Sequence, residues 1–177
     1  MTRAAATVDV YAWPLPSEPY VPGVTERPTA SVVFEISEAA PAVTEPDRWR
    51  EHEAWLAGFR LYGQGYFWET HEVWEPVWIG ARPNSAERVM VQGLIQLANG
   101  CLKVKMGRPK AALRLMSVAQ GCLDEAANGG RNRLMGLDLA AARDGLKRFV
   151  EAFPHTAGDA VLAARPNLEA MLDQSKI

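Results

Sequence analysis

The residues best suited to chemistry lie together in one segment, residues 66–78, which is rich in aromatic side chains. In a helix, His71 and Glu75 lie one turn apart and within about 40° of each other around the axis. Four aromatic residues fall within about 60° of His71 on the same helix, namely Phe67, Trp68, Trp74 and Trp78. An imidazole and a carboxylate at positions i and i+4 have the spacing with which a helix chelates a metal ion. The segment therefore predicts a buried site for a divalent metal or a polar small ligand at His71 and Glu75.

The other two acids of this segment, Glu69 and Glu72, point further around the helix, and we expect them to face solvent or a partner. If a metal were bound, Glu72 would be the candidate general base for a metal-bound water, as in a hydrolytic site. Pro76 lacks a backbone N–H, so the carbonyl of Glu72 loses its helical partner. A kink or a small polar gap is expected there.

Partners for a buried His–Glu pair are available on the next predicted helix, residues 86–106. Four polar residues lie on one stripe of it, namely Gln92, Gln96, Asn99 and Lys103. The short connection at 80–85 favours antiparallel packing of the two helices, which brings this stripe against residues 66–79. We expect Gln92 or Gln96 to complete the site, with Trp78 packed beside it.

Two motifs at these positions carry a family resemblance. The pattern His-x-x-x-Glu-x-x-Trp, filled by His71, Glu75 and Trp78, is followed by Gly-Leu-Ile-Gln-Leu-Ala at 93–98. From about residue 60 to 127 the chain resembles the domain of unknown function 309 (DUF309) family. The resemblance implies a small helical protein of bacteria and archaea, with a His-x-x-x-Glu motif proposed to bind metal and no established activity.

These residues have two alternative interpretations. In the first, His71 and Glu75 are a hydrogen-bonded pair that fixes helix packing in a non-catalytic structural or protein-interaction module. This structural interpretation is favoured because the segment lacks the second histidine of a zincin, and only His52 and His155 remain elsewhere in the sequence. In the second, the hairpin of residues 86–128 binds peptides as a tetratricopeptide unit does, although such units need about three copies and no second copy occurs.

Helical periodicity dominates from residue 47 onward. Predicted helices cover about 47–62, 66–79, 86–106 and 109–128, a fifth stripe ends at Phe153, and a short segment follows Pro166. The predicted fold is all-α, a five- or six-helix bundle-like domain over residues 47–177.

Residues 1–46 form a separate region in which seven of the twelve prolines are found. Because proline disfavours helix at and before its own position, this arm cannot be a long helix. It nevertheless contains apolar residues, including Tyr11, Trp13 and the run 32–34. We therefore expect an extended arm that lies over the helical body or over a partner subunit.

Composition excludes several classes of function. The 177 residues have a net charge of −2, which is unsuited to electrostatic binding of nucleic acid or anionic membranes. No apolar run is long enough for a membrane span, and residues 1–10 do not resemble a secretory signal. Cys101 and Cys122 lack metal or redox spacing, so we expect buried thiols and a cytoplasmic location. Nine of the fifteen aromatic residues fall in 49–78, and this surplus together with the apolar arm predicts a homodimer.

Overall fold

The computed structural model describes residue 9, residues 11–154 and residues 158–175. Its α-helices are α1 (Val32–Glu38), α2 (Glu53–Gly63), α3 (Phe67–Gly80), α4 (Ala86–Lys105), α5 (Pro109–Ala126), α6 (Leu139–Glu151) and α7 (Leu168–Met171). Two 3₁₀ segments cover Pro46–Glu51 and Asp159–Ala164, and the strands β1 (Arg133–Leu134) and β2 (Leu137–Asp138) pair in an antiparallel hairpin. The all-α prediction is confirmed. Within the described residues, no helix is long and apolar enough to cross a membrane.

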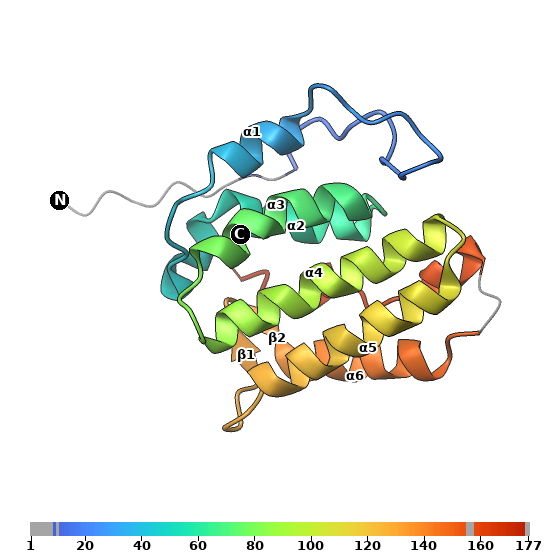
Figure 1. The fold of residues 1–177 in the computed structure, drawn as a ribbon. Coiled ribbons are helices and arrows are strands. Elements are labelled where there is room, and N and C mark those ends of the chain that lie inside the picture. The colour runs from blue at the N-terminus through green and yellow to red at the C-terminus, as the bar shows by residue number, and fades with distance from the viewer. Residues whose placement is uncertain (1–8, 10, 155–157, 176–177) are drawn as a thin grey trace.

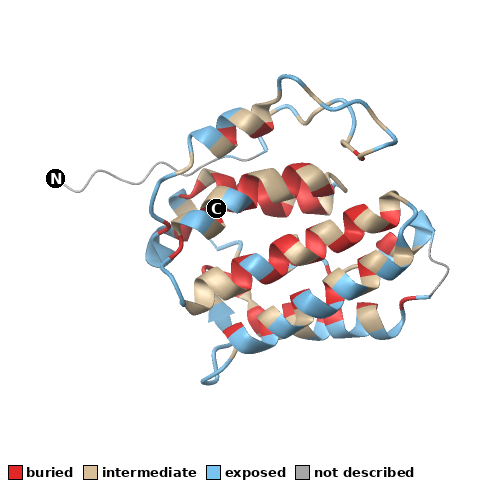
Figure 2. Cartoon of the chain, in the orientation of Figure 1, coloured by how far each residue is buried: buried red, intermediate tan, exposed pale blue. Residues whose placement is uncertain are grey.

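The helices form stacked layers, seen in Figure 1. The α4–α5 hairpin occupies the middle, α6 packs against α5, and α2 and α3 lie on the other side of α4. The short helix α1 is outermost and packs on α3. Figure 2 shows that the buried residues of α3 and α4 face the interior of this stack. Helix α3 thus lies between α1, α2 and α4. Its rotation about its own axis therefore determines which of the predicted site residues face a neighbouring helix and which face solvent.

Most predicted helix boundaries are confirmed. Ser85 caps α4 by accepting a hydrogen bond from the N–H of Arg88, and Pro109 begins α5. The first helix is an exception, because residues 46–51 form a 3₁₀ segment and α2 begins only at Glu53. The β1–β2 hairpin was not predicted. Its turn uses Met135 and Gly136, which have positive φ angles of 44° and 78°.

The contact between α2 and α3 is built from aromatic rings and one glycine. Trp55 and Phe59 of α2 surround Trp74 of α3, with ring centroids 6.0 and 5.2 Å from the Trp74 ring. The indole N–H of Trp74 donates to the carbonyl of Trp55 at 3.1 Å. This indole lies directly against Gly58, where an added Cβ would be 2.0 Å from Trp74 Nε1. The two helices approach this closely because position 58 carries no side chain.

The N-terminal arm packs on its own helical body. Arg60 donates to the carbonyl of Trp13, Tyr66 donates to the carbonyl of Pro16, and the N–H of Tyr20 donates to a carboxylate of α3. The described part of the arm contains no long helix, as expected, but residues 32–38 within it form the short helix α1, which was not predicted. This helix begins at Ser31, whose hydroxyl accepts a hydrogen bond from the N–H of Val33. It buries Val33 and Ile36.

The arm also donates hydrogen bonds to main-chain carbonyls of α3. Pro76 lies inside the helix, and the carbonyl of Glu72 that it leaves free accepts a hydrogen bond from the Ser37 hydroxyl at 3.0 Å. At the C-terminal end, Thr44 donates its hydroxyl to the carbonyl of Val77 and its N–H to that of Gly80. The polar gap expected at Pro76 is therefore present, and α1 fills it.

Removing the Ser37 hydroxyl should destabilise the protein through this carbonyl. We expect Ser37→Ala to lower the free energy of unfolding by about 1 kcal/mol, because the Glu72 carbonyl is left without a donor. In a Pro76→Ala background, where residue 76 regains its N–H, the same substitution should have a smaller effect. Urea unfolding of the four variants of this cycle measures the difference, and an equal loss in both backgrounds would contradict the assignment.

Candidate functional site

His71 lies half-buried on α3 and faces α4. Its Nδ1 is 3.0 Å from the side-chain oxygen Oδ1 of Asn99. Because an amide oxygen only accepts hydrogen bonds, Nδ1–H is the donor in this contact, and in the neutral ring the lone pair is on Nε2. The predicted antiparallel packing is present, and Asn99 is one of the polar residues expected to face α3.

Glu75 does not share this environment, because its side chain is exposed. The prediction of a buried His71–Glu75 pair is therefore wrong for the glutamate. Helix α3 packs against α1, α2 and α4, and Glu75 lies on the part of its circumference that these helices leave open. The rotation of about 40° between positions i and i+4 is enough to separate the imidazole from the carboxylate.

The residues expected to surround the pair are also dispersed. Trp78 is half-buried beneath Arg88, whose guanidinium carbon lies 4.4 Å from the ring centroid. Gln92 is exposed and Gln96 is half-buried. Within the described part of the chain, neither glutamine hydrogen-bonds to His71. The α4 contact of His71 is made by Asn99 instead.

Glu72, the candidate general base, lies half-buried on the side of α3 that faces the arm. Burial raises the pKa of its carboxyl, and the negative charge of Glu75 adds to the rise. Interactions with His71 and with the guanidinium of Arg27 oppose the rise. Arg27 belongs to the arm, so the electrostatic environment of Glu72 includes a residue far from it in sequence.

The most deeply buried acid of the segment is Glu69, which was expected to face solvent or a partner. That expectation is wrong, because the arm covers this side of α3 and leaves Glu69 only 1% exposed. Its Oε1 accepts the N–H of Tyr20 at 2.8 Å, and its Oε2 is buried without a hydrogen-bond partner among the described residues. Burial is the main cause that raises the pKa of this carboxyl. The apolar content of the arm was the sequence signal that this face would be covered.

The donors near His71 do not form a metal centre with three protein ligands. Among the residues that the structure describes, no three His, Cys, Asp or Glu side chains lie close enough together to hold an ion. Catalytic zinc sites require three such ligands and an open position. His155, one of the two remaining histidines, lies outside the described residues. The described side chains around His71 therefore do not supply these three ligands.

Neither cysteine has the environment of a nucleophile. Cys101 is fully buried, and burial raises the pKa of its thiol to about 12. Cys122 is half-buried, with a pKa that burial also raises. Both are free cysteines, and the prediction of buried thiols is confirmed for Cys101, whereas Cys122 is only half-buried.

Comparison with known families agrees with the resemblance seen in the motifs. Residues 55–115 match the model of the family described as domain of unknown function (DUF309). This segment belongs to the DUF309 family. It contains α3 and α4 complete and most of α2, so the DUF309 segment includes His71, Glu75 and Asn99 but not the arm. No curated protein and no solved structure matches the chain.

The buried carboxyl of Glu69 predicts a specific pH dependence. Its pKa is higher in the folded chain than the ordinary value of 4.5, so its contribution to stability is present below pH 4.5 and is lost as the pH rises through the folded-state pKa. Glu69→Gln keeps an acceptor for Tyr20 but cannot ionise. We expect the free energy of unfolding of Glu69→Gln to rise relative to that of wild type as the pH increases.

Urea unfolding between about pH 4 and 8 measures this difference. Glu75→Gln, on the exposed side of the same helix, is the matched control for removing a charge from α3. A constant difference between Glu69→Gln and wild type at every pH would contradict the burial of an ionisable carboxyl beneath the arm.

Proposed function

We propose that this protein is a non-catalytic helical module, structural or for protein interaction, in which His71 fixes the packing of α3 on α4. The observation that carries the proposal is the 3.0 Å contact between His71 Nδ1 and Asn99 Oδ1. It uses one imidazole nitrogen for a contact between helices, while the carboxylate expected beside the imidazole is exposed to solvent.

A second polar contact between the same helices supports this role. Arg88 of α4 lies over the ring of Trp78 and donates to the carbonyls of Ile79 and Ala81 at the end of α3. The two contacts lie toward opposite ends of the paired helices. Polar contacts at two separate points define one register, since sliding either helix would break both.

A second candidate function is binding of a polar small ligand or a divalent cation at Nε2 of His71. The contact with Asn99 favours it, because a neutral ring that donates from Nδ1 has its lone pair on Nε2, and histidines that bind metal commonly donate their other N–H to an oxygen. In this case Nε2 of His71 would be the protein donor, with solvent completing the shell. Hydrolysis is not part of this candidate, since the described residues supply no third ligand.

Two further proposals concern the state of the protein in the cell. A homodimer is supported by the exposed side chains of Val43 and Ile79, which line one groove together with Pro83. Light scattering across micromolar concentrations tests it. A cytoplasmic location is supported by the free cysteines Cys101 and Cys122.

If His71 is a packing residue, it and Asn99 should be energetically coupled. We expect His71→Ala and Asn99→Ala each to lower the free energy of unfolding by about 1 kcal/mol, and the double variant to lose less than the sum. Gln92→Ala, on the exposed side of α4, is the control and should change stability by less than about 0.5 kcal/mol. Urea unfolding measures all four, and strict additivity would contradict the proposed role.

Thermal melts with divalent cations separate the two candidates. Under the packing role, Zn²⁺ or Mn²⁺ should leave the Tm of wild type and of His71→Ala equally unchanged, because no ion binds to the folded chain. A rise in Tm that is present in wild type and absent in His71→Ala would contradict it and favour the ligand site.

A further inference from the structure

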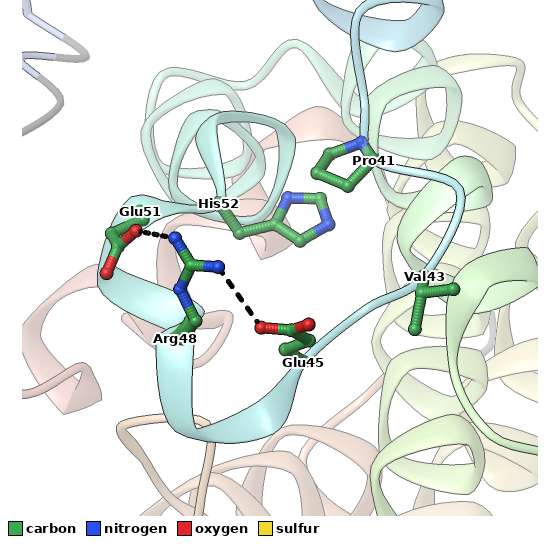
Figure 3. Close-up of a pocket in the computed structure, with 6 residues that line it drawn as sticks. All are labelled: Pro41, Val43, Glu45, Arg48, Glu51 and His52. Carbon is green, nitrogen blue, oxygen red and sulfur yellow. Dashed lines mark hydrogen bonds and ion pairs between the residues drawn. The ribbon is translucent and has the colours of Figure 1, made fainter.

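A pocket of about 180 Å³ lies outside both the DUF309 segment and the α3–α4 contact. It is formed where the connection from α1 meets the start of α2, and Figure 3 shows its lining. The lining residues are Pro41, Val43, Glu45, Arg48, Glu51 and His52. The imidazole of His52 lies between Pro41 and Arg48 in this view.

His52 occupies the N-cap position of α2, which fixes its tautomer. Its Nδ1 accepts the N–H of Trp55 at 3.4 Å, so Nδ1 must keep its lone pair. The side chain is only 4% exposed, and burial lowers the pKa of the imidazole, so the ring is neutral at pH 7. The proton of the neutral ring is therefore on Nε2.

This Nε2–H group is a buried donor without an acceptor among the described residues. Buried donors are nearly always paired with protein or with water, and leaving one unpaired is unfavourable. The pocket that His52 lines is the available place for the missing acceptor. A carbonyl, carboxylate or water oxygen could fill this role.

The charges around the pocket limit which class of ligand can supply this acceptor. Arg48 contacts Glu45 at 3.3 Å and also pairs with Glu51, so two carboxylates surround one guanidinium. The excess negative charge disfavours an anion, and an ammonium-type cation has no acceptor for the N–H of His52. Carboxylate oxygens that Arg48 does not use can accept hydrogen bonds from a neutral ligand. Pro41 and Val43 supply apolar walls.

We infer that this pocket binds a small neutral molecule that carries an amide group. The amide oxygen accepts the hydrogen bond of His52 Nε2–H, and the amide N–H donates to Glu45 or Glu51. Because Nε2 is buried, the oxygen reaches it when a lining side chain shifts, and the lining residues Pro41 and Val43 are exposed. The inference does not depend on the role of His71.

Three probes of similar size test this assignment, namely acetamide, acetate and methylammonium. The readout is the ¹⁵N chemical shift of His52 Nε2 during titration of the whole chain. We expect saturable shifts with acetamide, with a Kd of about 1–100 mM, as fits a ligand of so few atoms. Acetate and methylammonium should not saturate. No saturation with acetamide, or an equal response to acetate, would overturn the inference.

His52→Asn is the matched variant, because asparagine is among the best N-cap residues and keeps α2 capped while removing the Nε2–H donor. Backbone amide shifts of Val43 and Glu51 report binding in this variant, and its thermal melt reports folding. We expect the variant to fold and its saturable response to acetamide to be lost. An unchanged acetamide response would place the binding elsewhere and overturn the inference, as would a crystal soaked in acetamide that shows only water beside Nε2.

Discussion

The close approach of α2 and α3 at Gly58 and Trp74 is the constraint on which the rest of the structure depends. The indole of Trp74 occupies the space that a side chain at position 58 would need, and it hydrogen-bonds to α2 through its N–H. This contact fixes how α3 is rotated about its axis. With Trp74 toward α2, His71 turns to α4, Glu69 lies under the arm and Glu75 is left in solvent.

The arm is part of the fold, although it lies outside the DUF309 segment. Helix α3 contains a proline and a buried carboxylate, which are both unfavourable inside a helical stack unless they find hydrogen-bond partners. Ser37 pairs with the carbonyl that Pro76 leaves free, and the N–H of Tyr20 pairs with Glu69. The body in turn binds the arm backbone through Arg60 and Tyr66. The arm and α3 therefore depend on each other for their polar groups.

Sequence periodicity predicted much of this arrangement because it depends on local rules. Glycine and proline breaks, the Ser85 cap and the direction of His71 toward the polar stripe of α4 follow from helix geometry alone. The environments of Glu69 and Glu75 could not be predicted in the same way. Each differs from its neighbours by a modest rotation, and which side of α3 is covered depends on an arm that is distant in sequence. No sequence motif identifies His52, because its role as a buried N-cap residue depends on how the chain packs around the start of α2.

The stability of Gly58→Ala relative to Gly121→Ala tests this account most directly. Gly121 is exposed on α5 with open space around it, so alanine there should raise the free energy of unfolding by about 0.5–1 kcal/mol. At position 58 the same methyl group would collide with the Trp74 ring, and we predict a loss of at least about 2 kcal/mol despite the better helix propensity of alanine. Equal or greater stability of Gly58→Ala relative to wild type would contradict the account, because α3 would then not be held in this rotation by the glycine.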